Sequence, residues 1–316
     1  MIPSSGHNPQ PDDSSRHQET PGAELAIVIP AYKPDFLREA LRSLAAQTDH
    51  RFHIYIGDDA SPYEIKSIVD EFSSLLPISY HRFPSNLGAH DLVAQWERCI
   101  NLTKEEKWLW LFSDDDILSP ECVSDFYAAV RANPEGELFH FNVRIIDSRG
   151  KTISNPPLYP HRMKAGEYLE YKLRGKVISF VVEFIFSRNL YKRVGGFQNF
   201  DLAWGADFMT WLKMAANNRQ GIITVPGNSR VGWRRSEVNI SPDKTRPILL
   251  RKLNALIENA AFIKKELKEK PELYSPLKYS FRWIRFPIGE IWRNRSRLRI
   301  YDITGLLSRY IRRMMR

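Results

Sequence analysis

The sequence is poor in cysteine and contains no long hydrophobic run. Among its 316 residues the two cysteines, Cys99 and Cys122, form no CxxC pair, so we expect neither a disulfide scaffold nor a zinc module. No apolar run reaches the roughly 18 residues that a membrane-spanning helix needs. The first residues also lack the basic and apolar stretches of a secretory signal. We therefore expect a protein of the reducing cytoplasm.

Glycine-rich phosphate loops are absent as well. The sequence contains neither GxxxxGK[ST] nor GxGxxG, which disfavours P-loop and dinucleotide-fingerprint chemistry. It contains no GxSxG elbow, which disfavours an α/β-hydrolase. Metal-assisted binding of a diphosphate is then the interpretation left for the acidic groups described below.

Positive charge is concentrated at the carboxyl end. The formal net charge is +9, and residues 271–316 contain eleven Lys and Arg but three acidic residues. The rest of the chain is therefore close to neutral. The basic segment also contains Trp283, Phe286 and Trp292. Such a segment suits an anionic membrane surface or a solvated helix packed on the body, and it suits nucleic acid less well.

The pattern along the chain predicts three parts. Residues 1–23 are rich in Pro, Ser, Gln and acids and read as a disordered leader. Residues 24–240 alternate between strand and helix patterns, and residues 241–316 read as a helical, basic extension. Strands are predicted at residues 25–30, 52–57, 78–83, 108–112, 138–146, 177–186 and 222–225, and helices at residues 35–47, 61–72, 90–100, 119–132, 207–217 and 247–270. This order predicts an α/β fold with an open, mostly parallel sheet and helices on both faces.

Candidate binding residues follow three of the predicted strands. They are Pro30, Ala31 and Tyr32 after the first strand, Asp58 and Asp59 after the second, and Asp114, Asp115 and Asp116 after the fourth. In an open α/β sheet, ligands bind beyond the carboxyl ends of the strands. Adjacent carboxylates repel one another unless a cation is present, and carboxylates suit Mg²⁺ or Mn²⁺. The alternative is an acidic cap for the helix that follows.

Asp207 is the candidate base. It lies at the start of a predicted helix, whose amino terminus would favour its ionised form. The alternative is that Asp207 only caps that helix. The aromatic residues nearby, Trp204 among them, suit a sugar face as well as a protein core.

Four short segments of the sequence carry a resemblance to a known family. AIVIPAYKPDFLREALRSLAAQT is followed by GDDASP, then NLG, then WLWLFSDDDIL. In this order they resemble the family-2 glycosyltransferases of the GT-A fold. The resemblance is strong over residues 24–130. Through Gly195-Gly196-Phe197, Asp207 and Trp233-Arg234 it extends more weakly to about residue 240.

The resemblance implies how a nucleotide is held. Pro30, Ala31 and Tyr32 would line the nucleotide pocket, with Tyr32 near the base. Asp58 would accept a hydrogen bond from the base imide, and Asp59 would brace the loop.

It also implies the residues around the sugar and the metal. Asn86 and Gly88 would shape the pocket around the nucleoside. Asp114 would face the ribose or the donor sugar. Asp115 takes the main metal position, with Asp116 beside it, so Mg²⁺ or Mn²⁺ is the implied cofactor.

The remaining implied roles concern the acceptor and the diphosphate. Asp207 falls where the family has its catalytic base. Gly196, Trp204, Trp233 and Arg234 would lie in the acceptor and diphosphate region. The sequence departs from the family pattern here, since no histidine follows Trp233-Arg234. Either metal affinity would be weaker, or Arg234 and Arg235 would help to neutralise the diphosphate.

These observations predict an inverting glycosyltransferase. It would move a sugar from a nucleotide-diphosphate donor, with UDP expected from family frequency, to a hydroxyl of a glycan or lipid-linked acceptor in cell-surface polysaccharide synthesis. The predicted location is the cytoplasm, peripherally on the inner face of the membrane, with an anionic membrane surface as a partner and no nucleic acid. Two alternatives stay open: a nucleotidyltransferase that makes nucleotide sugars, and a non-catalytic module that binds membrane or nucleic acid.

Overall fold

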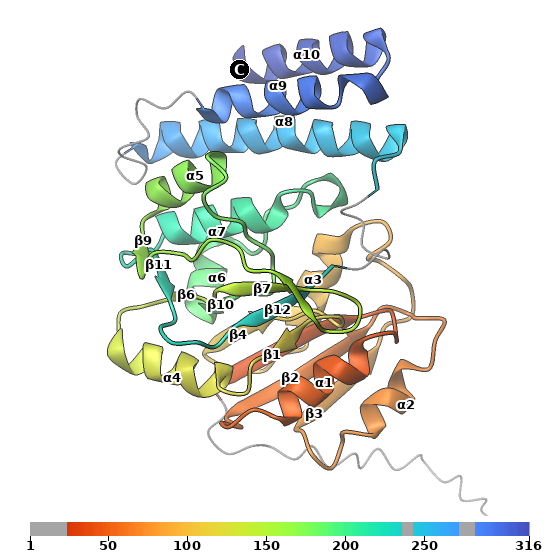
Figure 1. Ribbon diagram of the computed structural model, residues 1–316, viewed down its shortest axis with the longest axis vertical. Coiled ribbons are helices and arrows are strands. Elements are labelled where there is room, and N and C mark those ends of the chain that lie inside the picture. Colours follow the sequence, from red (N-terminus) through yellow and green to blue (C-terminus); the bar gives the residue numbers. More distant parts are fainter. Residues whose placement is uncertain (1–23, 236–242, 272–281, 316) are drawn as a thin grey trace, which may run out of the picture.

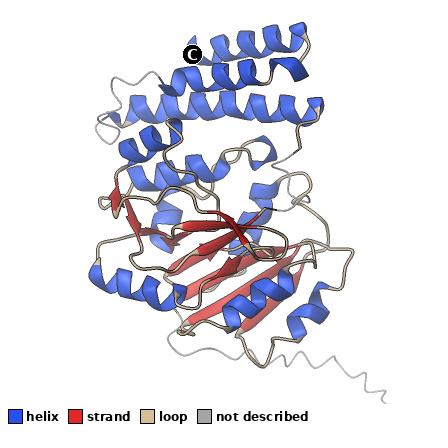
Figure 2. Cartoon of the chain, viewed as in Figure 1, coloured by secondary structure: helices blue, strands red, loops and turns tan. Residues whose placement is uncertain are grey.

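The computed structural model describes residues 24–235, 243–271 and 282–315. Its strands lie in one part of the molecule, and a layer of helices lies at the opposite end (Figure 1, Figure 2). The predicted leader at residues 1–23 and the predicted boundary between residues 240 and 241 lie outside the described residues.

The main sheet has eight strands. They are β1 (Leu25–Ala31), β2 (Phe52–Asp58), β3 (Ile78–Arg82), β4 (Trp108–Leu111), β6 (Leu138–His140), β9 (Arg162–Met163), β10 (Phe184–Ser187) and β11 (Ile222–Thr224). Their order is β3-β2-β1-β4-β10-β6-β11-β9. The strands from β3 to β4 are parallel, whereas β10 is antiparallel to both of its neighbours. The predicted open, mostly parallel α/β sheet is confirmed.

A second, four-stranded sheet was not predicted. It contains β5 (Ile117–Leu118), β7 (Val143–Ile146), β8 (Thr152–Ser154) and β12 (Val231–Arg234), in the order β5-β12-β7-β8. The single strand predicted at residues 138–146 is in fact β6 and β7, one in each sheet. Asn142 lies between them, and its Oδ1 accepts a hydrogen bond from the Tyr159 N–H at 2.9 Å. The strand predicted at residues 177–186 begins only at Phe184.

Helices cover both faces of the main sheet. They are α1 (Leu37–Ala45), α2 (Ile65–Asp70), α3 (Leu92–Ile100), α4 (Cys122–Ala132), α5 (Ala165–Leu173), α6 (Arg188–Val194) and α7 (Ala206–Ala216), with a short 3₁₀ helix η1 (Asp201–Ala203) before α7. Successive side chains of a strand point to opposite faces. Accordingly, Ile27 and Ile29 of β1 join the core under α1, α2 and α4. Ala26 and Val28 join the core under α3, α5, α6 and α7.

Three more helices form a layer over α5 and α7. They are α8 (Arg246–Glu269), α9 (Arg282–Arg293) and α10 (Ile300–Met315), with a 3₁₀ turn η4 (Arg295–Arg297) between the last two. The layer has its own small core, which contains Leu253 and Ile257 of α8, Ile291 of α9 and Leu306 of α10. Farther along α8, Ile263 belongs to the core of the sheet part. The basic carboxyl-terminal segment therefore packs on the body through α8 (Figure 1).

Within residues 24–235, 243–271 and 282–315, no helix combines the length and the apolar character needed to cross a bilayer.

Candidate active site

The carboxyl ends of β1, β2 and β4 surround a cleft of about 260 Å³. These strands are parallel neighbours, so their ends meet at one edge of the sheet. The predicted residues that line the cleft are Pro30, Ala31, Tyr32, Asp59, Asp114 and Asp115. The structure therefore brings together residues from three separate sequence motifs.

Asp114 and Asp115 are two desolvated carboxylates held side by side. Asp114 Oδ2 accepts hydrogen bonds from the backbone N–H of Tyr32 at 3.0 Å and of Lys33 at 3.2 Å. Burial, with the Asp115 charge as the second cause, raises the pKa of Asp114 to about 7. Burial also raises the pKa of Asp115, whose Oδ1 accepts a hydrogen bond from Ser113 Oγ at 2.6 Å. In both cases the largest cause is burial, which disfavours the charged form of a carboxyl group.

The chemistry of this pair fits a hard divalent cation. Carboxylate oxygens suit Mg²⁺ and Mn²⁺, and such ions are often held by one or two carboxylates together with substrate phosphates. In the part of the chain that the structure describes, no group of three or more His, Cys, Asp or Glu side chains is arranged to hold a metal ion. Asp114 and Asp115 are adjacent carboxylates in the cleft lining that could hold such an ion.

Asp116 and Arg234 lie behind the acidic loop and contact it. Asp116 is 2% exposed, and its Oδ1 accepts a hydrogen bond from the Arg234 N–H at 2.6 Å. Arg234 is fully buried; its Nε donates to the Asp115 carbonyl at 2.7 Å and its Nη2 to Glu39 Oε2 at 2.6 Å. Neither Asp116, expected beside the metal, nor Arg234, expected near the diphosphate, is part of the cleft lining.

Asp58 lies outside the cleft lining, and Asp59 lies within it. Asp58 is fully buried; its Oδ1 accepts from the Ser61 N–H at 2.8 Å, and its Oδ2 accepts from the Tyr80 hydroxyl at 2.5 Å and Arg82 Nη1 at 2.8 Å. These bonds stabilise the turn after β2. Asp59 also contacts Arg98 and the loop at residues 87–88, in keeping with a role in holding that loop.

Asn86 and Gly88 belong to the loop that contacts Asp59, and neither is part of the cleft lining. The Asp59 carboxylate accepts hydrogen bonds from the backbone N–H of Leu87 at 2.7 Å and of Gly88 at 2.8 Å. A Cβ on Gly88 would lie 2.7 Å from Asp59 Oδ2, so only glycine allows this approach. Asn86 Oδ1 accepts from the Ala89 N–H at 2.9 Å and closes the same turn.

A second cavity of about 450 Å³, the chamber, adjoins the cleft and is lined in part by Asp207. The two cavities share Leu92, Trp96 and Val181 in their linings. Most of the chamber wall is aromatic or aliphatic, and it includes Trp204, Phe208 and Trp233 from the sheet part and Leu256, Asn259, Trp283 and Phe286 from α8 and α9. The predicted acceptor residues Trp204 and Trp233 are thus brought to the same cavity as the predicted base.

Asp207 lies in the first turn of α7, next to buried charges of both signs. Burial raises its pKa, and the positive charge of Lys172 acts in the opposite direction. Lys172 lines the chamber, and its Nζ donates to Ser179 Oγ at 2.8 Å. Glu183 is fully buried, and its Oε1 accepts from the Phe180 N–H at 2.8 Å. Burial raises the pKa of Glu183 well above its ordinary value.

Gly196 lies outside both cavities. Its φ is +79°, and a Cβ there would come within 2.7 Å of Glu97 Oε1. The next residue, Phe197, donates its N–H to the same carboxylate oxygen at 2.6 Å. Gly196, expected in the acceptor region, therefore lies where the α6–α7 connection contacts α3.

Lys172 and Glu183 were missed in the sequence. Lys172 lies in EYLEYKLRGK, where a lysine resembles one on an ordinary exposed helix face. Glu183 carried a usable signal, because it is a single acid within the apolar run SFVVEFIF. An acid in such a run is either buried at considerable cost or functional.

Comparisons with known proteins agree with this architecture. The family described as "Glycosyl transferase family 2" matches residues 26–195. The chain is 25% identical over 192 residues to the succinoglycan biosynthesis protein ExoW of Rhizobium meliloti (strain 1021), covering 54% of this chain and 57% of that protein. It is 24% identical over 140 residues to protein CgeD of Bacillus subtilis (strain 168), covering 42% and 33%. The aligned region thus spans less than two thirds of both curated relatives.

Solved structures share the fold at low sequence identity. S. aureus TarS 1-349 in complex with UDP-GlcNAc has a TM-score of 0.59 and 14% identity, over 92% of this chain and 88% of that one. The mannosyltransferase PcManGT from Pyrobaculum calidifontis, in complex with GDP-Man and Mn2+, has a TM-score of 0.53 and 13% identity, over 90% and 79%. With a family match over more than half of its length, this chain belongs to glycosyl transferase family 2 and has the GT-A fold.

Proposed function

We propose that the protein is an inverting glycosyltransferase that uses a nucleotide-diphosphate sugar. The observation that carries this proposal is the junction of the two cavities. The acidic cleft at the strand ends and the chamber with Asp207 share Leu92, Trp96 and Val181. A donor in the cleft and an acceptor in the chamber would therefore meet at one place.

The cleft would bind the donor, with UDP as the expected nucleotide. Pro30, Ala31 and Tyr32 would line the nucleoside, and Asp59 would face it in place of Asp58. Asp114 and Asp115 would hold Mg²⁺ or Mn²⁺, which when bound supplies positive charge against the leaving diphosphate. TarS 1-349 is in complex with UDP-GlcNAc, and PcManGT is in complex with GDP-Man and Mn2+, which supports this assignment.

The chamber would bind the acceptor hydroxyl near Asp207. The Asp207 carboxylate takes the hydroxyl proton, and the hydroxyl oxygen forms a bond to the anomeric carbon. The bond from that carbon to the diphosphate oxygen breaks on the opposite face, and the nucleoside diphosphate leaves with the electron pair. Trp204 and Trp233 would contribute flat apolar surfaces for a sugar ring.

The proposed acceptor is a glycan or lipid-linked glycan of cell-surface polysaccharide synthesis. The similarity to ExoW, a succinoglycan biosynthesis protein, supports this class. The proposed location is the cytoplasmic face of the membrane, with residues 24–240 as the transferase unit and residues 241–316 as a peripheral membrane-contacting extension. Exposed apolar residues on α9 and α10, among them Trp292 at 63% and Ile300 at 82%, support the membrane contact.

Calorimetric titration of the full chain with UDP, GDP and dTDP, with and without Mn²⁺, tests the donor site. We expect metal-dependent binding of one of the three nucleotides. No binding of any nucleotide to a folded sample contradicts the proposal. Release of pyrophosphate from a nucleoside triphosphate, instead of a nucleoside diphosphate from a nucleotide sugar, indicates a nucleotidyltransferase.

A further inference from the structure

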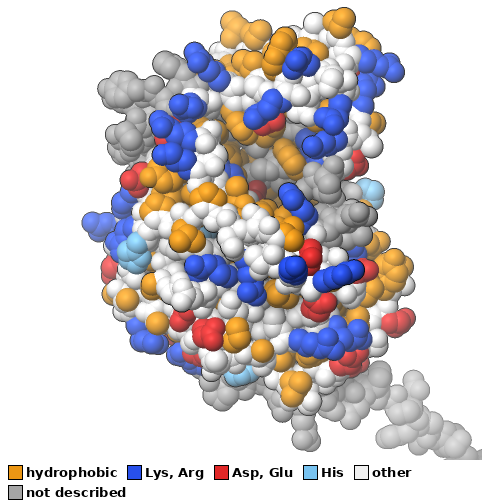
Figure 3. Space-filling view, in the orientation of Figure 1, with side chains coloured by type: hydrophobic (Ala, Val, Ile, Leu, Met, Phe, Trp, Pro, Cys, Tyr) orange, Lys and Arg blue, Asp and Glu red, His pale blue; other side chains and the backbone are white. Residues whose placement is uncertain are grey.

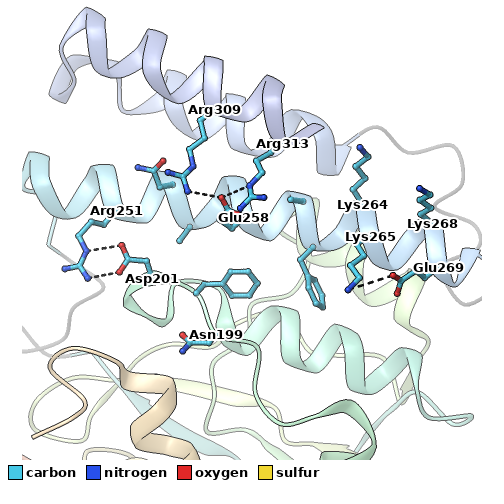
Figure 4. A pocket seen from close by; sticks show the side chains of 15 residues that line it. Asn199, Asp201, Arg251, Glu258, Lys264, Lys265, Lys268, Glu269, Arg309 and Arg313 are labelled. Carbon is cyan, nitrogen blue, oxygen red and sulfur yellow. Dashed lines mark hydrogen bonds and ion pairs between the residues drawn. The ribbon is translucent and has the colours of Figure 1, made fainter. Parts of the chain in front are cut away.

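A large cavity of the described structure lies outside both the cleft and the chamber. It is an open groove of about 960 Å³ along α8, bounded on one side by α10 and on the other by residues 199–201 (Figure 4). Its lining on α8 extends from Arg251 to Glu269. At 1.5 Å per residue this is about 27 Å, which is the length of several sugar units.

Positive charge dominates this groove. Six cationic side chains line it against three acidic ones; the cations are Arg251, Lys264, Lys265, Lys268, Arg309 and Arg313, and the acids are Asp201, Glu258 and Glu269. One acid, Glu258, is shared by two arginines, Arg309 at 3.0 Å and Arg313 at 2.7 Å. More cations than acids are thus gathered at one surface, which attracts a ligand with several negative charges.

The lysines at the far end of α8 hold most of the charge available to a ligand. Lys265 lies 3.9 Å from Glu269, at the outer limit of an ion pair. Lys264 Nζ donates to the Met314 carbonyl at 2.6 Å, a neutral partner. Neither Lys264 nor Lys268 is paired with an acid within the described residues. Figure 4 shows Lys264 and Lys268 extending away from the acids of the groove.

The floor of the groove is apolar, and one wall is shared with the chamber. Ala255, Ala261 and Phe262 of α8 line the groove, whereas Leu256 and Asn259 of the same helix line the chamber. The segment around η1 is shared in the same way. Phe200 and Asp201 line the groove, and Leu202, Ala203 and Trp204 line the chamber that contains Asp207. A single helix and a single short segment thus separate the two cavities.

We propose that the groove along α8 binds a negatively charged stretch of the acceptor polymer, so that the acceptor is an acidic glycan chain. Carboxylate or phosphate groups on the chain would pair with Lys264, Lys265 and Lys268, and its sugar rings would lie on the apolar floor. This inference rests on the proposed function, because it takes the bound polymer to be the acceptor whose end enters the chamber. An acidic glycan is favoured over a lipid surface because the groove is bounded on both sides and borders the chamber.

The test compares the affinity of the full chain for two oligosaccharides. One is an oligogalacturonate about ten sugars long, which is negatively charged, and the other is a neutral dextran oligomer of equal length. We expect the charged chain to bind and the neutral chain to bind at least tenfold more weakly. The triple variant Lys264→Gln, Lys265→Gln, Lys268→Gln should lower the affinity for the charged chain at least tenfold. The matched variant Arg293→Gln, Arg295→Gln, Arg297→Gln, with the same loss of charge at the α9–α10 turn, should change it less than twofold.

Several outcomes would overturn the proposal. Equal losses in the two triple variants indicate general attraction to a basic protein. Equal binding of the charged and neutral chains would contradict pairing between acidic groups of the polymer and the three lysines. A groove variant that loses binding to vesicles containing anionic lipid, while it keeps binding to the oligogalacturonate, assigns the groove to a membrane. Nucleotide titration of the groove variant separates the donor-site proposal from the groove proposal. Failure of every nucleotide to bind contradicts the donor site, and it does not affect the measurement of polymer binding.

Discussion

At the scale of single residues, Asp207 has the most specific role in the proposed reaction. Replacing Asp207 with Asn keeps the size of the side chain and removes the base. Because general bases contribute about a hundredfold or more, we expect the transfer rate to fall by at least that factor. Nucleotide binding, measured by calorimetry, should be almost unchanged because Asp207 does not line the donor cleft. Transfer near the original rate would show that Asp207 only caps α7.

Lys172 is predicted to set the pH at which Asp207 is active. Burial raises the pKa of Asp207 and the charge of Lys172 opposes that shift. Removing the positive charge in Lys172→Met makes the carboxylate harder to ionise, so its pKa rises further. The acid limb of the pH–rate profile should move to higher pH in this variant and should return in Lys172→Arg. A lower rate with an unmoved limb would show a purely structural role through Ser179.

Asp58 and Asp59 show how much of the site could be predicted from the sequence. The sequence identified Asp58 and Asp59 as site residues, since both follow β2 directly. It could not assign their roles, because these depend on Tyr80 and Arg82 of β3 and on the loop at Gly88. Those partners are separated from the pair by about twenty to thirty positions, and only the sheet brings them near.

At the scale of elements, α8 positions the start of α7. Asn259 Nδ2 of α8 donates to the Trp204 carbonyl at 3.1 Å. Gly205, the residue before α7, has φ +82°, and a Cβ there would lie 2.1 Å from the same Asn259 nitrogen. The appended helix is thus in contact with the segment that leads into Asp207.

This contact predicts the effect of Gly205→Ala. The left-handed backbone costs a residue with a Cβ about 1–2 kcal/mol, and Asn259 must also move. We expect lower stability in thermal unfolding and a transfer rate reduced more than nucleotide affinity. The control is Gly305→Ala within α10, where a Cβ meets nothing within 4 Å. It should leave activity unchanged and raise stability by up to about 1 kcal/mol. Equal effects of the two substitutions would contradict the role of α8.

Elements differed in how well they could be predicted. The strands β1, β2 and β4 were found because each is a short apolar run, as expected of a strand buried on both faces. The second sheet escaped prediction because β5, β7, β8 and β12 have two to four residues each. Such strands carry too little pattern of their own, and β12 pairs with β5 and β7, which lie about ninety or more positions earlier in the chain.

At the scale of the whole molecule, the outermost layer is amphipathic. Exposed apolar side chains are concentrated on α9 and α10, and they are Ile288, Trp292, Ile300, Tyr301, Ile311 and Met315. Figure 3 shows hydrophobic side chains beside blue cations at the end of the molecule formed by this layer. Amphipathic helices bind a membrane surface by inserting apolar side chains and by electrostatic attraction of arginines to anionic lipid.

The amphipathic layer predicts vesicle binding by the full chain. Replacing Trp292 and Ile300 with serine should weaken binding to vesicles containing anionic lipid about tenfold or more, because both side chains are largely exposed. The control replaces Leu75 and Leu158, exposed by 62% and 64% on the sheet part, and should have no effect. Sedimentation with vesicles of matched anionic and neutral composition measures both. Unchanged binding of the Trp292/Ile300 variant would contradict the membrane contact.

The sequence by itself determined the fold class, the family resemblance and the acidic strand ends. These depend on short-range patterns of apolar residues and on residues adjacent in the chain, so they can be seen without the structure. Only the tertiary structure decided which carboxylates line the cleft, because this depends on burial and on hydrogen bonds from distant segments. Asp59, Asp114 and Asp115 line the cleft, whereas Asp58 and Asp116 do not. It also decided that Lys172 lies near Asp207 and that α8 separates two cavities, because both follow from packing between elements far apart in sequence.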